Sequence, residues 1–308
     1  MDLLERVRAG GLIGEDDRVI VLLSGGRDSV CLLDVVARIA ADVRALHVNY
    51  GLREEAGADE AACRALCARL AVPLEVQRAE RPADAGNLQA WARDVRYGLG
   101  AQLAAREDAL LAAGHTATDQ AETILYRLAS SPSRRALLGM QASKGRLVRP
   151  LLSCTREETR AHCLTRGLPW VDDASNESDA FARARVRAGL VPALRAVHPA
   201  AERNVVRAAE LLREEAAVLD EVVDTALAGR DHITLDHLRI LPPALGRLVL
   251  RRLAEEAVGE LCPRVSGRYE EVLDLSDHAM LDLGDGARAV VRNGTLRFER
   301  TPPLPVHG

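Results

Sequence analysis

One short stretch of the sequence has the residue types of a phosphate site, Ser24-Gly-Gly-Arg-Asp-Ser29. Glycines in a turn let the backbone approach a ligand closely, and a following helix points its free N–H groups and positive dipole end at the same place. A kinase-type loop would need a lysine here, and the only lysine of the chain is Lys144. A carboxylate such as Asp28 suits a phosphate site when Mg²⁺ bridges the two groups. The alternative is an ordinary turn with a solvated aspartate.

A second motif brings three titratable groups into two helical turns. His115, Asp119 and Glu122 stand at positions i, i+4 and i+7, so they share one face of a helix. A zinc site is conceivable, but oxygen ligands beside a triphosphate favour Mg²⁺. We therefore predict that Asp28, Asp119 and Glu122 hold a magnesium ion. The alternative is an acidic helix start that is favoured by the helix dipole.

Arginines supply the third kind of candidate site. Arg93 and Arg96 are three residues apart, hence on one helix face and able to reach a common anion, although a solvated face is the alternative. Residues 127–149 contain six basic side chains and no acidic one in a chain of net charge -4, and residues 183–187 add a second cluster. Such one-sided charge makes this segment a candidate phosphate-binding surface, with a solvated basic loop as the alternative. The predicted members are Arg127, Arg134, Arg135, Lys144, Arg146, Arg183 and Arg187.

Strands and helices alternate in the part of the chain that carries these motifs. The patterns predict strands over residues 19–23, 43–50, 72–77 and 109–113, and helices over residues 30–39, 51–70, 88–106 and 119–128. This order predicts a doubly wound parallel sheet. Ligands of such sheets bind at the carboxyl ends of the strands, where the motifs at Ser24–Ser29, His47–Arg53 and Gly114–Thr123 fall.

The pattern changes near residue 199. Residues 200–229 read as one long helix, residues 235–258 are helical again around Pro242-Pro243, and Asn293-Gly294 between alternating strands predicts a hairpin. We therefore expect an α/β catalytic domain over residues 1–198. A smaller, mainly helical domain over residues 199–308 would end in a β-hairpin and would contact RNA. It carries no catalytic pattern.

Taken together, the motifs resemble the tRNA(Ile)-lysidine synthetases, a family of PP-loop (N-type) ATP pyrophosphatases with a Rossmann-like fold. The likeness continues through Arg149-Pro-Leu-Leu, Trp170–Asn176 and Arg183–Arg187, and it is firm from about residue 19 to residue 194. Thr118 stands where this family usually has the first of two adjacent aspartates. That departure leaves Asp28 and two further carboxylates for the metal.

The resemblance implies an AMP-forming ligase that modifies tRNA, with ATP and Mg²⁺ as cofactors. The wobble cytidine of an isoleucine tRNA with a CAU anticodon would be adenylated, and free L-lysine would then displace AMP. It also implies two sets of site residues. The catalytic set is Asp28, His115, Asp119 and Glu122, and the ATP-binding set is Ser24, Gly25, Gly26, Arg27, Asp28, Ser29, His47, Asn49, Arg93 and Arg96.

Two other classes stay open, another PP-loop adenylating enzyme (a tRNA thiolase or an amide-forming synthetase) and a non-catalytic nucleotide-binding protein. The six cysteines form no Cys-x-x-Cys pair, which argues against a cluster-dependent thiolase. The charged amino terminus and the lack of an apolar run of roughly 18 residues predict a cytoplasmic protein without membrane contact. The oligomeric state is open, with a homodimer as one option.

Overall fold

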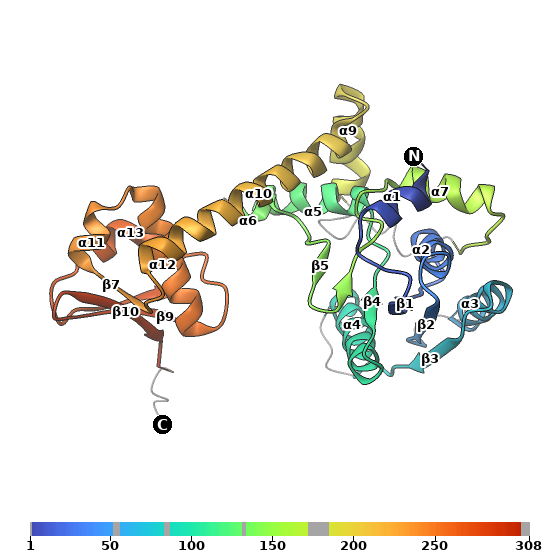
Figure 1. Cartoon of the computed structure of the whole chain (residues 1–308), viewed down its shortest axis with the longest axis horizontal. Helices are drawn as coiled ribbons and strands as arrows, with labels where there is room; N and C mark the ends of the chain where they lie inside the picture. Colours follow the sequence, from blue (N-terminus) through green and yellow to red (C-terminus); the bar gives the residue numbers. More distant parts are fainter. Residues whose placement is uncertain (1, 52–55, 83–86, 131–133, 172–184, 303–308) are drawn as a thin grey trace. The chain divides into compact units, whose positions relative to one another are not determined.

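The computed structural model describes residues 2–51, 56–82, 87–130, 134–171 and 185–302 (Figure 1). The chain forms two compact units, residues 1–210 and residues 211–308. Within the described ranges, no helix combines the length and the apolar character that crossing a membrane requires.

A six-stranded sheet is the centre of the first unit, with the strand order β3-β2-β1-β4-β6-β5. The first five strands of this order run parallel, and β5 pairs antiparallel with β6. This mostly parallel sheet confirms the predicted fold class. The strands are β1 (Arg18–Leu22), β2 (Asp42–Asn49), β3 (Leu74–Arg78), β4 (Leu110–Ala112), β5 (Ser143–Lys144) and β6 (Leu147–Val148).

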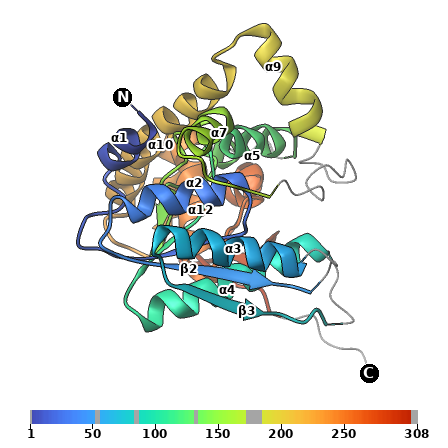
Figure 2. The ribbon, with the colours of Figure 1, turned by 90° about the vertical axis from the view of Figure 1, so that its right-hand side faces the viewer.

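Helices lie on both faces of this sheet. In Figures 1 and 2, α2 and α3 lie on one face and α4 lies on the other. The described helices of the unit are α1 (Leu3–Ala9), α2 (Arg27–Ala37), α3 (Ala56–Leu70), α4 (Leu88–Arg106), α5 (Ala117–Ser130), α6 (Arg134–Leu137), α7 (Arg156–Thr165), the π-helix η2 (Val186–Leu190), α9 (Val191–Val197) and α10 (Ala201–Leu227), which continues into the second unit.

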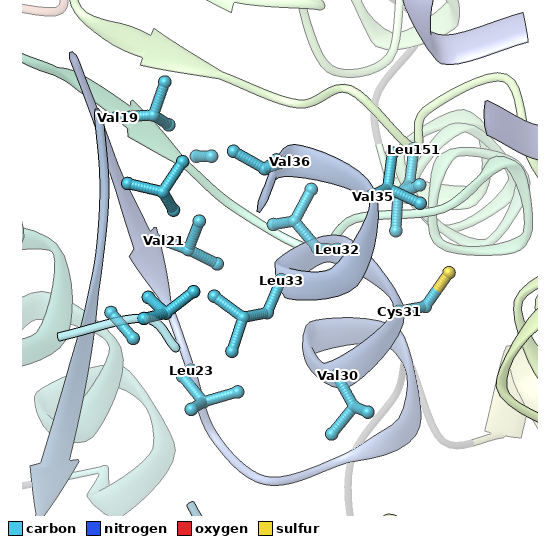
Figure 3. Close-up of a cluster of buried hydrophobic side chains, with 14 of the residues drawn as sticks. Val19, Val21, Leu23, Val30, Cys31, Leu32, Leu33, Val35, Val36 and Leu151 are labelled. Carbon is cyan, nitrogen blue, oxygen red and sulfur yellow. The ribbon is translucent and has the colours of Figure 1, made fainter. Parts of the chain in front are cut away.

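Strand β1 shows why the sheet needs helices on both faces. Val19 and Val21 belong to the hydrophobic cluster that includes Leu32 and Leu33 of α2, as Figure 3 shows. Ile20, between the two valines, belongs to the cluster that includes residues of α4. Because successive strand side chains point to opposite faces, an unbroken apolar strand must be covered twice. The start of α2 is thereby fixed against the end of β1.

The second unit has its own hydrophobic core around a four-stranded antiparallel sheet of order β7-β10-β9-β8. The predicted hairpin is β9–β10, with Asn293 and Gly294 at positive φ in its turn. The predicted helical stretch divides at Pro242-Pro243 into α11 and α12. The elements are β7 (His232–Thr234), α11 (Leu235–Ile240), α12 (Pro243–Val258), the 3₁₀ helix η3 (Val265–Arg268), α13 (Tyr269–Leu273), β8 (Met280–Gly284), β9 (Ala287–Arg292) and β10 (Thr295–Arg300).

Candidate active site

The turn between β1 and α2 is built for a ligand that accepts hydrogen bonds. Gly25 has φ +85°, a left-handed conformation that side chains rarely adopt. Gly26 is the N-cap of α2, and no side chain in the described ranges caps that helix, so N–H groups of its first turn face outward. The hydroxyl of Ser29 donates to the Gly26 carbonyl at 2.7 Å and lies 3.1 Å from the Ser24 hydroxyl. The turn thus offers backbone N–H groups and a hydroxyl pair to an anion.

The end of β4 lies directly against this turn. A Cβ atom on Gly114 would stand 3.1 Å from the carbonyl oxygen of Asp28 and 3.2 Å from the backbone nitrogen of Ser29. A larger residue would therefore push the two segments apart. The close approach brings the motif that begins at His115 beside the phosphate turn.

The three predicted carboxylates meet around one arginine, Arg156. Its guanidinium nitrogens lie 2.6 Å from Asp119 Oδ1, 2.9 Å from Glu122 Oε1 and 3.6 Å from Asp28 Oδ2. Asp28 also accepts a hydrogen bond of 2.5 Å from the hydroxyl of Thr159. The structure thus brings together side chains from α2, α5 and α7.

Charge pairing controls protonation in this cluster. Burial by itself would raise the pKa of Asp119, but Arg156 and hydrogen bonds from Thr116 lower it below its ordinary range. The same carboxylates raise the pKa of Arg156 in spite of its burial. Glu122, whose side chain is 4% exposed, receives a second cation, Arg187, at 2.8 Å. The cluster is consequently a dense, ionised network.

Arg156 was not among the residues expected from the sequence. The available signal was the capping box at the start of α7, where Thr155 and Glu158 exchange hydrogen bonds with each other's backbone. That pattern places Arg156 at the first helical position but says nothing of its partners. The contacts arise only from the fold, since Asp28 and Arg156 come from different helices.

The hydroxyl of Thr118 has a buried hydrogen-bond partner, which explains why a threonine fits at this position. Its hydroxyl donates a hydrogen bond of 2.8 Å to Glu202 of α10, whose carboxylate also binds Arg195. Glu202 is 6% exposed. A hydroxyl can satisfy this buried carboxylate, whereas a second carboxylate would repel it.

A cavity of about 220 Å³ opens beside the carboxylate cluster. Its wall has charges of both signs together with a small apolar part from Val191 and Pro192. Such a wall suits a small ligand that carries both an ammonium and a carboxylate group. Its charged and polar lining residues are Arg27, Thr118, Glu122, Arg156, Glu157, Arg160, Arg187 and Arg195.

His115 lies between the Asp119 carboxylate and a group of arginines, both of which affect its pKa. Its Nε2 lies 3.4 Å from the hydroxyl of Tyr97, and the two rings stack with centroids 6.4 Å apart. The guanidinium carbons of Arg93 and Arg96 lie 5.0 and 5.8 Å from the Tyr97 ring centre. Burial, together with nearby arginines, lowers the pKa of His115 to about 4. The imidazole is neutral at pH 7, and its Nδ1 is buried without a hydrogen-bond partner in the described ranges.

His47 and Asn49, at the end of β2, are occupied by contacts within the protein. His47 is 4% exposed, and its Nδ1 lies 2.9 Å from the Leu23 carbonyl oxygen. Asn49 donates to Glu60 at 2.9 Å and accepts from the backbone of Gly51. The His47 contact joins the ends of β1 and β2 next to the phosphate turn, and the Asn49 contact with Glu60 joins the end of β2 to α3.

The predicted phosphate-binding cations do not form one cluster. Arg187 joins the carboxylate cluster, while Arg127 donates to the Gly139 carbonyl at 2.9 Å and Lys144 is exposed on β5. Arg146 precedes β6 and lies 2.5 Å from Asp108, so it stands at the amino ends of the parallel strands, away from the phosphate turn. Arg134 and Arg135 are half-buried on α6, and Arg183 lies outside the described residues.

Comparisons with known proteins agree with this geometry. A family model described as a PP-loop domain matches residues 5–194. A tRNA(Ile)-lysidine synthase of Salinispora tropica is 40% identical over 77% of this chain and 76% of its own length. A tRNA(Ile)-lysidine synthase of Pseudomonas fluorescens is 39% identical over 67% of this chain. The match covers only about half (48%) of the length of that protein.

A solved structure shares the fold. The U34-tRNA thiolase of Methanococcus maripaludis superposes with a TM-score of 0.59, covering 68% of this chain and 78% of its own, at 16% identity. That likeness shows the fold alone. The Salinispora and Pseudomonas relatives, both above 30% identity, are tRNA(Ile)-lysidine synthases, so the comparisons do not favour the thiolase and amide-forming alternatives.

Proposed function

The chain belongs to the tRNA(Ile)-lysidine synthase family, and on that premise we propose that it attaches free L-lysine to the wobble cytidine of an isoleucine tRNA with a CAU anticodon. ATP would be consumed, and AMP and pyrophosphate released. The observation that carries the proposal is the junction of the Ser24–Ser29 turn with the carboxylate cluster and its mixed-charge cavity.

In the first step, the O2 atom of the cytidine attacks the α-phosphorus of ATP, and pyrophosphate leaves. The turn between β1 and α2 binds the leaving phosphates through backbone N–H groups and the hydroxyls of Ser24 and Ser29. Arg27, at the first position of α2, adds positive charge there. His47 and Asn49 support this proposal as residues that hold the end of β2 in place next to the turn.

Magnesium fits this site only together with the nucleotide. In the described ranges no group of three His, Cys, Asp or Glu side chains is arranged to hold a metal, because Arg156 stands between the carboxylates. Mg²⁺ usually takes one or two protein carboxylates plus phosphate oxygens and waters. Asp28, beside the turn and 20% exposed, would supply such a ligand, with Asp119 and Glu122 near it. The ion would supply neutralisation of the leaving pyrophosphate.

In the second step, the ε-amine of lysine attacks carbon 2 of the cytosine ring, and AMP departs with the former O2 atom. We assign the lysine to the mixed-charge cavity, where Arg160 would bind its carboxylate. Glu157, which pairs with Arg195 at 3.0 Å, would bind its ammonium group. At about 220 Å³ the cavity is smaller than pockets for drug-sized ligands, which run to roughly 300–1,000 Å³. The attacking amine must lose a proton, and either His115 or a carboxylate would accept it.

The predicted RNA contacts remain proposals. Arg127, Arg134, Arg135 and Lys144 come from one segment that contains basic and no acidic residues, which supports a phosphate-binding role. A role for the second unit in tRNA contact, the cytoplasmic location and a homodimer stay predictions.

The proposed function is tested by ATP-dependent incorporation of radiolabelled lysine into an unmodified transcript of the isoleucine tRNA. The matched control is an initiator methionine tRNA, which shares the CAU anticodon. Incorporation into the isoleucine tRNA alone is the expected result. Pyrophosphate release without lysine incorporation would refute the proposed nucleophile, and silence in both assays would refute the adenylation step.

A further inference from the structure

The guanidinium of Arg156 occupies the position between the three carboxylates that a metal ion would need. Each of its nitrogen atoms faces a different acidic side chain. Nε lies 3.6 Å from Asp28, Nη2 lies 2.6 Å from Asp119, and Nη1 lies 2.9 Å from Glu122. Carboxylates this close together repel one another unless a cation stands among them. In this fold the cation is a side chain of the protein itself.

The charges of this cluster balance without a metal ion. Besides Arg156, Arg27 lies 3.3 Å from Asp28 and Arg187 lies 2.8 Å from Glu122. Among the described residues, three arginines therefore face the three carboxylates. A cluster without net negative charge attracts a free divalent cation only weakly, and Mg²⁺ also gives up its water shell reluctantly. Free Mg²⁺ should therefore bind weakly as long as Arg156 stays in place.

Asp28 and Asp119 are the carboxylates that Arg156 can release most easily. Their side chains are 20% and 19% exposed, whereas that of Glu122 is 4% exposed. Glu122 would keep Arg187, which donates two hydrogen bonds of 2.8 and 3.1 Å to it. Mg²⁺ usually takes one or two protein carboxylates, with phosphate oxygens and waters as its other ligands. Two released carboxylates therefore match the protein's share of a magnesium site.

The side chain of Arg156 has room to move while its backbone stays fixed. Arg156 is the first residue of α7, and the capping box of Thr155 and Glu158 holds that end of the helix. The side chain is 19% exposed and lines the cavity of about 220 Å³. A change of side-chain rotamer can therefore carry the guanidinium from the carboxylates into the cavity without unfolding α7.

We propose that Arg156 is a displaceable counter-ion, which keeps Asp28 and Asp119 closed to a free divalent cation. Arg156 releases these two carboxylates when Mg²⁺ arrives bound to ATP, because the phosphate turn then binds the nucleotide and raises the effective concentration of the metal at the cluster. The inference rests on the proposed function for the identity of the nucleotide.

The inference is tested with Mn²⁺ as the probe, since the EPR signal of the free ion is lost on binding. Its dissociation constant is measured without nucleotide for the wild type, Arg156→Met and Arg187→Met. Both substitutions remove one positive charge from the cluster, but only Arg156→Met clears the position between Asp28 and Asp119. Arg187→Met is therefore the matched control. We expect Arg156→Met to bind Mn²⁺ at least about tenfold more tightly than the wild type and the control.

Two further measurements cover the case that Arg156→Met does not fold. Arg156→Lys keeps the charge, but a shorter side chain with a point charge cannot face three carboxylates at once, so it should bind Mn²⁺ more tightly than the wild type. The wild type is also measured with α,β-methylene-ATP, which cannot be cleaved between its α and β phosphates. The analogue should tighten retention of Mn²⁺ by the wild type at least about tenfold, and Asp28→Asn should lose most of this gain.

Equal Mn²⁺ affinity in folded Arg156→Met and the wild type would overturn the inference, and so would an equal gain in Arg187→Met. If Arg156→Met does not fold, the absence of a gain in Arg156→Lys would overturn it. A wild type that binds Mn²⁺ equally tightly with and without the analogue would overturn it as well. Lysine incorporation by the wild type tests the proposed function separately, because Mn²⁺ binding requires neither tRNA nor lysine.

Discussion

The carboxylate cluster around Arg156 contrasts with a second cluster, formed by Arg93, Arg96, Tyr97, His115 and Arg149 and called the Tyr97 cluster. The two clusters differ in whether their arginines pair with carboxylates. Asp28, Asp119 and Glu122 are all within 3.6 Å of one guanidinium. Arg93, Arg96 and Arg149 have no carboxylate partner in the described ranges. The arginine of the first cluster is paired with carboxylates, and the second cluster contains two buried nitrogen atoms, Arg149 Nε and His115 Nδ1, without a hydrogen-bond partner in the described ranges.

This difference separates two uses of buried charge. A paired network holds helices in register and stays ionised, so it stabilises the free protein only as long as every partner is present. Unpaired cations contribute little to folding, but they are ready for an anion that arrives later. Substitutions in the carboxylate cluster should therefore change the free energy of unfolding, and substitutions of the arginines in the Tyr97 cluster should change anion binding.

The largest effect is expected when the paired cluster loses its centre. Arg156→Met leaves three carboxylates without their shared cation, and breaking a buried ion pair in this way costs about 3–5 kcal/mol. The free energy of unfolding in urea measures it. Arg160→Met, one turn further along α7 and exposed, is the matched control and should change stability by less than about 0.5 kcal/mol. Equal losses in the two variants would refute the central role of Arg156.

His115 should make the Tyr97 cluster sensitive to acid. Its folded-state pKa is about 4, below the ordinary value of 6.5, so between these values the unfolded chain binds more protons. Stability therefore rises with pH across this window and is lost on acidification, by up to about 3 kcal/mol for the full shift. His115→Asn should flatten that part of the profile, whereas His198→Asn, at an exposed histidine, should not. Parallel profiles for both variants and the wild type would contradict the assignment.

Asp28→Asn should separate function from stability within the paired cluster. An asparagine at this position can still accept the hydrogen bond from Thr159, so the fold should persist. The lost charge should lower pyrophosphate release at least about 100-fold, or about 2.7 kcal/mol of transition-state stabilisation. Asp42→Asn, an exposed carboxylate paired with Arg18, is the control. Retained activity would remove Asp28 from the chemistry.

The smallest effect is expected from Arg93→Gln measured on the free protein. Removing one cation from an unpaired cluster should leave the free energy of unfolding unchanged or raise it by about 0.5 kcal/mol, because repulsion is relieved. The pKa of His115, followed by proton NMR, should rise for the same reason. A stability loss above about 1 kcal/mol would show that Arg93 has a structural partner after all.

Local patterns were sufficient to predict most of the fold. The helix predicted over residues 88–106 is α4 with the same bounds, because the Asn87 side chain caps the backbone N–H groups of Gln89 and Ala90. The hairpin follows from Asn293-Gly294, both of which take the positive φ that such a turn needs. Strands β5, β6 and β7 were missed, since two or three residues carry too little periodicity to be recognised, and β8 was missed as well.

The candidate site was only half predictable. Motifs at strand ends identified the three carboxylates, but their partner Arg156 comes from a helix far along the chain and looks like an ordinary first-turn residue. Arg149 lies within the basic segment that the sequence predicted as a phosphate-binding surface, but the sequence did not predict its burial. Arg149 is buried, and its Nε has no hydrogen-bond acceptor in the described ranges. Both properties depend on the tertiary structure around the residue, which a local sequence pattern does not predict.

The hydrogen bond between Thr118 and Glu202 limits which residues can occupy the two positions. An aspartate at position 118 would place a second carboxylate next to the buried Glu202 carboxylate, which now accepts a hydrogen bond from the Thr118 hydroxyl at 2.8 Å. We therefore expect that an aspartate is compatible with this fold at position 118 only if position 202 is neutral. The two positions constrain each other, although they are 84 residues apart in the sequence.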